Sequence, residues 1–116
     1  MKKQETISAE RKLQGMIGLA ARAGAVKSGE FAAEQSVRGG KAKLCLLASD
    51  ASEGSIKKFT DMCGHRNIPV IETGFTKEAL GHMIGRGERA SLTVEDQGFA
   101  KSMITLIEKG GNACDQ

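Results

Sequence analysis

The sequence predicts an α/β fold, a three-layer α/β/α sandwich around a small mixed four-stranded sheet. With 116 residues, 40% of them hydrophobic and 27% charged, the chain has the size and composition of one compact domain. Amphipathic helical stretches alternate along the chain with short apolar stretches that are typical of strands. Since strands that alternate with helices are joined by right-handed crossovers, we expect a layer of helices on each face of the sheet.

The first helix is predicted from Ala9 onward, where apolar residues recur with helical spacing until Gly24. Its inward-facing stripe is formed by Leu13, Met16, Ile17 and Ala20. This stripe places one side of the helix against a core. A short extended stretch follows at residues 25–27.

A second helix is expected from about Gly29 to Arg38, with Ser28 as its N-cap and the Gly39-Gly40 pair at its end. The run from Leu44 to Ala48 is short and continuously apolar, which is the pattern of a central strand covered on both faces. Helices must therefore lie on both sides of the sheet.

A third helix is expected to be capped by Ser52 or by Ser55. Its apolar side is formed by Ile56, Phe59, Met62 and Cys63. Asn67 and Pro69 then indicate a turn that leads into a strand at Val70-Ile71.

The last part of the chain contains two more helices and one more strand. Thr76 is expected to cap a short helix that ends at Ile84, and a polar loop at residues 85–89 leads into a strand from Ser91 to Val94. Asp96 then caps the final helix. The inward-facing residues of that helix are Phe99, Met103, Leu106 and Ile107.

The domain is predicted to span residues 9–109, with flexible tails at residues 1–8 and 110–116, because the two ends are polar and carry no apolar period. No apolar run approaches the roughly 18 to 20 residues that a membrane-spanning helix requires, so no membrane partner is expected. The odd number of cysteines, without a close pair, indicates a reduced, cytoplasmic location. These cysteines are Cys45, Cys63 and Cys114.

Charge and aromatic content both bear on nucleic-acid binding. Seventeen Lys and Arg against fourteen Asp and Glu leave a net charge of only +3, so any affinity for nucleic acid must come from clustered positive charges. The chain has four Phe, no Trp and no Tyr, which gives few surfaces on which unstacked bases can lie. Recognition of folded RNA therefore fits better than binding of single strands.

Motifs for other chemistries are incomplete. The stretch from Gly24 to Gly29 does not match a phosphate-binding P-loop, because Val26 stands where that motif requires glycine. Cys63 and His65 lack a second pair of ligands with the spacing of a zinc site. No spacing identifies a catalytic triad or a carboxylate dyad, although a site assembled in space stays open. We therefore expect no enzyme activity, no cofactor, no metal and no small-molecule substrate.

Basic residues gather at the junctions between the predicted elements. An ordinary solvated surface explains any one of them, but together they can form one surface that faces phosphates. These residues are Arg22, Lys27, Arg38, Lys41, Lys43, Arg86 and Arg89. The free N–H groups after Ser28 and Gly29, at the start of the second helix, can also receive a phosphate oxygen.

Several segments, taken in their order and spacing, carry a family resemblance. They are Lys27-Ser28-Gly29-Glu30, the eleven-residue step from Gly29 to Gly40, Lys41-Ala42-Lys43-Leu44, and Ala48-Ser49-Asp50-Ala51-Ser52. In these the chain resembles the kink-turn-binding ribosomal-protein superfamily, of the L-seven-Ae and L-thirty-e type. It is similar to the bacterial YlxQ-like branch in Ile68-Pro69-Val70, Lys77 to Gly81, and Glu95-Asp96-Gln97-Gly98-Phe99-Ala100. The resemblance covers roughly residues 12–108 and implies the same α/β/α sandwich.

The resemblance also implies where RNA binds, namely the start of the second helix and the loop before the last strand. The better-known members carry Asn, Glu and, three residues later, Lys where this chain has Phe31, Ala32 and Gln35. Phe and Ala cannot hydrogen-bond to purine edges, so the usual base-reading contacts are missing. Phe31 is either a core residue or an exposed stacking residue. The charged loop at residues 85–89 replaces the aliphatic side chains common in the family and favours phosphate clamping.

The sequence thus predicts a noncatalytic, monomeric protein that binds structured RNA, ribosomal or kink-turn-like, as an accessory to ribosomes. The alternative is a protein-interaction module on the same scaffold with the RNA site lost, and a third possibility is an enzyme that acts on RNA. The predicted RNA-binding residues are Lys27, Ser28, Gly29, Glu30, Phe31, Glu34, Gln35, Arg38, Lys41, Arg86, Gly87 and Arg89.

Overall fold

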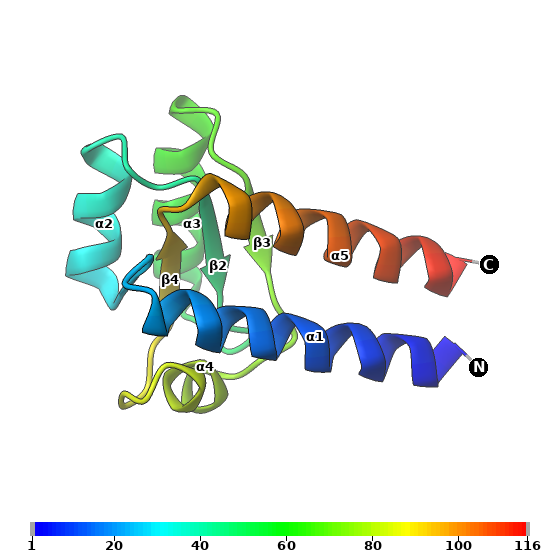
Figure 1. Ribbon diagram of the computed structural model, residues 1–116. Helices are drawn as coiled ribbons and strands as arrows, with labels where there is room; N and C mark the ends of the chain where they lie inside the picture. The colour runs from blue at the N-terminus through cyan, green and yellow to red at the C-terminus, as the bar shows by residue number, and fades with distance from the viewer. Residues whose placement is uncertain (1, 116) are drawn as a thin grey trace.

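The computed structural model describes the backbone of residues 2–115 and the side chains of residues 9–108. Helices and strands alternate along the chain and form an α/β sandwich, which confirms the predicted fold class (Figure 1). Their order is α1 (Lys2–Arg22), β1 (Val26–Ser28), α2 (Glu30–Arg38), β2 (Leu44–Leu47), α3 (Glu53–His65), β3 (Val70–Glu72), α4 (Lys77–Met83), β4 (Ser91–Val94) and α5 (Gln97–Asp115).

The sheet is mixed, as predicted, and its strand order is β1-β4-β2-β3. Strand β4 pairs antiparallel with both β1 and β2, whereas β2 and β3 are parallel. In the β1–β4 pair, Ser28 lies opposite Leu92. This pairing brings the end of β1 and the start of β4 together, so the segment after β1 lies beside the segment before β4.

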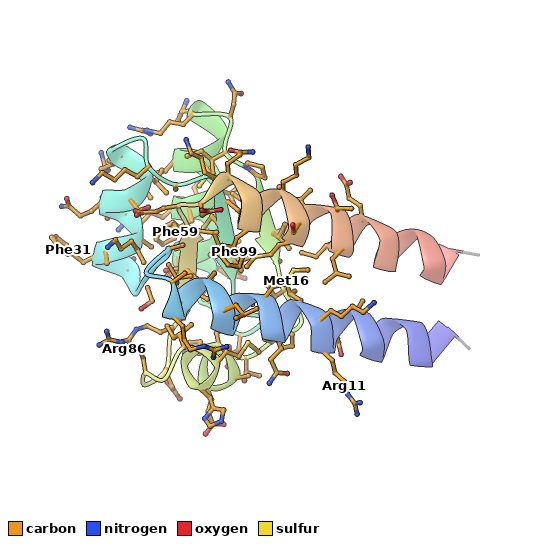
Figure 2. All side chains as sticks on the ribbon, in the orientation of Figure 1. Arg11, Met16, Phe31, Phe59, Arg86 and Phe99 are labelled. Carbon is orange, nitrogen blue, oxygen red and sulfur yellow. The ribbon has the colours of Figure 1, made fainter. Side chains whose placement is uncertain are left out.

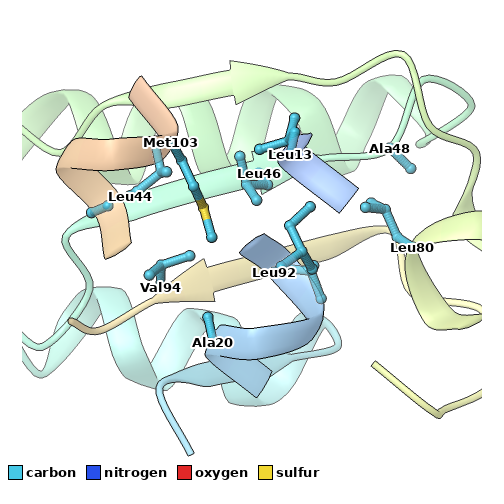
Figure 3. Close-up of a cluster of buried hydrophobic side chains, with 11 residues drawn as sticks. Leu13, Ala20, Leu44, Leu46, Ala48, Leu80, Leu92, Val94 and Met103 are labelled. Atoms are coloured by element: carbon cyan, nitrogen blue, oxygen red, sulfur yellow. The ribbon is translucent and has the colours of Figure 1, made fainter. Parts of the chain in front are cut away.

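Strand β2 separates two apolar cores, because successive side chains point to opposite faces of the sheet. Leu44 and Leu46 contribute to the core beneath α1, α4 and α5, which Figure 3 shows in close-up. Cys45 and Leu47 contribute to the core beneath α2 and α3. All four side chains are fully buried, which confirms the prediction of a central strand with helices on both faces.

Three helices begin with the caps that the sequence predicts. The Ser52 hydroxyl accepts a hydrogen bond of 3.1 Å from the N–H of Ser55, so Ser52 rather than Ser55 caps α3. Thr76 caps α4 in the same way. The Asp96 carboxylate accepts a bond of 2.9 Å from the N–H of Phe99 at the start of α5.

The predicted cap of the second helix is wrong. The N-cap of α2 is Gly29, and no side chain hydrogen-bonds to the helix start. Ser28 is instead the last residue of β1, where it pairs with Leu92 of β4. Strand β1 therefore extends through Ser28, the residue whose hydroxyl group predicted a helix cap.

Helices α1 and α5 lie side by side and project together beyond the sheet (Figure 1). Helix α1 begins at Lys2 and α5 ends at Asp115, so helical backbone extends past the predicted domain limits of 9 and 109 into both predicted tails. Once a helix is nucleated by its packed part, each further residue adds a hydrogen bond at little cost, even without an apolar stripe. Within residues 2–115, none of the helices has the length and apolar character to cross a membrane.

Candidate nucleic-acid interface

The start of α2 has no side-chain cap. Gly29 has a φ of 90° and a ψ of 156°, a backbone conformation in the positive-φ region that side chains disfavour. The N–H of Ala33 reaches the carbonyl of Gly29 at 2.9 Å, so the donors left without an intrahelical partner are those of residues 30–32. With no side chain capping them, these N–H groups and the helix dipole favour a phosphate oxygen.

Arg89 joins this helix end to the loop before β4. Its Nε donates a hydrogen bond of 3.1 Å to the Ser28 hydroxyl, and its Nη1 donates one of 2.9 Å to the carbonyl of Glu88. A Cβ on Gly29 would lie 3.8 Å from the Arg89 side chain. The two segments predicted to bind RNA, 61 residues apart for Ser28 and Arg89, therefore meet in one place.

The loop at residues 85–90 is held against α4 by backbone contacts. The N–H of Arg86 donates a bond of 2.8 Å to the carbonyl of Gly81, and the N–H of Arg89 donates one of 3.0 Å to the carbonyl of Lys77. A Cβ at Gly81 would collide with the carbonyl group of Gly87. Gly81 was not among the predicted site residues, although a glycine inside a helix is a signal for close backbone approach.

Helix α2 divides the other predicted residues into two sets. Glu34 and Arg38 lie on the side that faces α3, where Glu34 contacts Arg38 at 2.7 Å and Lys58 at 2.6 Å. Lys58 also lies 3.4 Å from Glu30.

These contacts shift the pKa values of both partners. The hydrogen bond from Lys58, and then that from Arg38, holds the pKa of Glu34 below its ordinary value. The bond to Glu34 raises the pKa of Lys58. Lys58 was not predicted, because it is distant from α2 in sequence.

The opposite side of α2 borders a groove of about 520 Å³. Its walls contain four predicted residues together with four that were not predicted. The lining residues are Lys27, Phe31, Ala32, Gln35, Ser36, Gly39, Lys41 and Glu95. Glu95 accepts a hydrogen bond of 2.7 Å from the Ser36 hydroxyl, a contact between residues 59 apart that no local sequence pattern reveals.

Phe31 is exposed, with 76% of its surface accessible, so the interpretation of Phe31 as a core residue is wrong. Figure 2 shows its ring on the outer side of α2 and Arg86 at the tip of the neighbouring loop. Lys27, Lys41 and Arg86 are exposed as well. Among the side chains of residues 9–108, these three and Arg89 form no ion pair, whereas Arg38 does. Four predicted cations are therefore available to an anionic partner.

Of the cysteines, the two whose side chains the structure describes, Cys45 and Cys63, lie away from this surface. Cys45 and Cys63 are fully buried in the core beneath α2 and α3. The neighbouring Cys63 thiol and burial together raise the pKa of the Cys45 thiol, which keeps it protonated and unreactive. Within the described part of the chain, no three His, Cys, Asp or Glu residues are grouped so that they could hold a metal ion.

Comparison with known proteins identifies two similar chains. The chain is 40% identical over 93 residues to the RNA-binding protein YlxQ of Bacillus subtilis (strain 168), covering 80% of this chain and 92% of that protein. It is 38% identical over 98 residues to the RNA-binding protein YlxQ of Enterococcus faecium, covering 84% and 93% respectively.

Solved structures give the same fold. A protein of unknown function from Bacillus halodurans C superposes with a TM-score of 0.79 at 38% identity, over 84% of this chain and 97% of that one. The Giardia lamblia 15.5kD RNA binding protein superposes with a TM-score of 0.71 at 20% identity, over 91% and 90%, and so shares the fold. A family model matches residues 11–104. The chain therefore belongs to the ribosomal protein L7Ae/L30e/S12e/Gadd45 family.

Proposed function

We propose that this chain is a noncatalytic, monomeric, cytoplasmic protein that binds structured RNA, ribosomal RNA above all. The contact surface, here called the RNA face, consists of the start of α2 at residues 28–31, the loop at residues 85–90, Lys27 and Lys41. The relatives described above that are named as RNA-binding proteins support RNA as the partner. Phosphates would bind to Lys27, Lys41, Arg86 and Arg89 and to the N–H groups at the start of α2.

The hydrogen bond from Arg89 to Ser28 carries this proposal. It places a guanidinium beside Gly29, at the uncapped start of α2. A guanidinium and the positive end of a helix dipole at one point suit a phosphate. Binding to the RNA phosphate backbone in this way needs no Asn, Glu or Lys at the positions of Phe31, Ala32 and Gln35.

A test of this function is charge reversal at the loop. The double variant Arg86→Glu/Arg89→Glu should lower affinity for ribosomal RNA at least tenfold and reduce the slope of log K against log salt by about 2, one unit for each lost phosphate contact. The matched control, Lys57→Glu/Lys101→Glu, changes the net charge equally but lies on α3 and α5. Equal loss in both variants, or no loss in either, would exclude this surface.

A second candidate function is protein docking through exposed Phe31. Among residues of described burial, the large exposed hydrophobic side chains are Phe31 on α2 and Leu19 on α1, at 76% and 52% exposure. Single exposed apolar residues are common on monomers, whereas a docking patch covers several hundred Å². RNA binding is therefore the better supported function.

A further inference from the structure

We infer that the groove beside α2 holds one unpaired nucleotide of the bound RNA, with its base stacked on Phe31 and with guanine preferred. The inference rests on the proposed RNA binding and adds a specificity site to it. The groove is continuous with the RNA face, because Lys27 and Phe31 belong to both. Its volume of about 520 Å³ leaves ample room for one nucleotide.

The lining of the groove combines an aromatic ring with basic side chains. Phe31, Ala32 and Gln35 line it from α2, and Lys27 of β1 lines it from the sheet. Lys41 lies beyond the C-terminal end of the helix. Two lysines beside an exposed aromatic ring suit a nucleotide, whose phosphate is anionic and whose base presents a flat apolar surface.

The exposed ring of Phe31 is the first argument for a base. Leaving Phe31 76% exposed forgoes the stabilisation that burial of such a side chain supplies. The sequence has four Phe and no other aromatic residue, and Phe59 is fully buried. A ring placed at the open start of a helix, beside Lys27, can stack on a base whose phosphate the helix end holds.

Glu95 supplies the preference for guanine. The Ser36 hydroxyl donates to its Oε2 at 2.7 Å, which fixes the carboxylate in the groove and leaves further acceptor positions on both oxygens. An ionised carboxylate only accepts hydrogen bonds, so it favours bases with adjacent N–H donors and disfavours uracil, whose single N3–H donor is flanked by two carbonyl acceptors. Guanine presents two adjacent donors on its pairing edge and matches a carboxylate best.

The test uses a pool of RNA hairpins whose internal loop is randomised, with sequencing of the bound fraction. The unchanged protein should enrich an unpaired guanine. Phe31→Ala should bind the selected hairpin about tenfold more weakly, as loss of one stacked base predicts, while Phe31→Trp retains affinity. Glu95→Gln should keep most of the affinity and lose the preference for guanine, because an amide replaces one of the two acceptor oxygens with a donor NH2 group.

Two control variants distinguish these effects from a non-specific loss of stability or RNA affinity. Leu19→Ala removes the other large hydrophobic side chain that is exposed among residues 9–108. Glu72→Gln neutralises an exposed carboxylate on β3, at the far edge of the sheet. If Phe31→Ala binds like Leu19→Ala, or Glu95→Gln selects like the unchanged protein, the groove does not bind a base. That result leaves the proposed function intact, provided that Arg86→Glu/Arg89→Glu still weakens binding. Absence of any RNA binding by the unchanged protein would overturn both.

Discussion

Individual side chains decide which of the cations on and around α2 can contact RNA. Arg38 donates to Glu34 at 2.7 Å, and Lys58 contacts the same carboxylate at 2.6 Å. These ions neutralise one another on the side of α2 that faces α3. Lys27 and Lys41, on the groove side, have no such partner among the described residues and keep their full charge for phosphates.

The ion pair between Glu34 and Lys58 predicts a defined pH dependence. The pKa of folded Glu34 lies below the ordinary 4.5, so its contribution to stability is present above pH 4.5 and is lost as pH falls through the folded pKa. The pKa of Lys58 lies above the ordinary 10.5, so its contribution is present below pH 10.5 and is lost as pH rises further. Both side chains are still partly accessible to solvent, 23% for Glu34 and 37% for Lys58, so the effect on total stability is small.

Replacement of Lys58 should therefore raise the pKa of Glu34. In Lys58→Met the largest cause of the lowered value is gone and Arg38 alone remains, so the carboxylate should titrate closer to 4.5. NMR titration of the Glu34 side-chain carboxyl carbon measures this directly. Lys57→Met, which removes a neighbour that pairs with Asp61 instead, is the control. Identical Glu34 titration curves in the two variants would contradict the ion-pair assignment.

At the scale of elements, the position of the loop at residues 85–90 depends on one glycine of α4. Gly81→Ala should destabilise the fold by about 1 to 3 kcal/mol, as overpacking of a tight contact does, because its Cβ collides with Gly87. RNA affinity should fall at the same time, since the loop that carries Arg86 and Arg89 is displaced. Urea denaturation and RNA titration measure the two effects.

Gly64 of α3 provides the control for this substitution. It also lies inside a helix, but a Cβ there would meet nothing within 4 Å. Gly64→Ala should therefore stabilise the protein by roughly 0.5 to 1 kcal/mol through helix propensity, with no effect on RNA. If both alanine variants have the same stability and bind RNA equally, Gly81 does not position the loop.

Local patterns predict the elements well and the contacts between them poorly. The continuously apolar run at 44–48 identifies the buried strand that the structure places at 44–47. Hydroxyl or carboxylate signals identify the caps Ser52, Thr76 and Asp96, because each depends on neighbours a few residues away. Ser28 fails as a cap because pairing of β1 with β4, a distant strand, overrides the local preference.

The segments of the candidate site can be predicted from the sequence, whereas the contacts between them cannot. The start of α2 and the loop at residues 85–90 follow from the family resemblance, and basic residues at both are visible in the sequence. Glu95, Lys58 and Gly81 escape prediction because each matters through a contact made across the fold. The exposure of Phe31 depends on how α2 rotates on the sheet, which its own sequence does not determine.

At the scale of the whole molecule, the mixed sheet is what assembles the RNA face. Because β1 and β4 are antiparallel neighbours, the exit from β1 into α2 adjoins the entry of the loop at residues 85–90 into β4. Helices α1 and α5 lie on the opposite face of the sheet from α2 and α3 (Figure 1). The start of α2 and the loop at residues 85–90 thus lie at the same end of the sheet.

The most direct test of this account is an NMR titration of the isotope-labelled protein with fragments of ribosomal RNA. The account predicts that backbone amides of residues 28–32 and 85–90 shift together and saturate at the same RNA concentration, while those of β3 and of α3 at residues 57–65 stay in place. Shifts that cluster elsewhere, or that affect only one of the two segments, would contradict a single RNA face built from the start of α2 and the loop before β4.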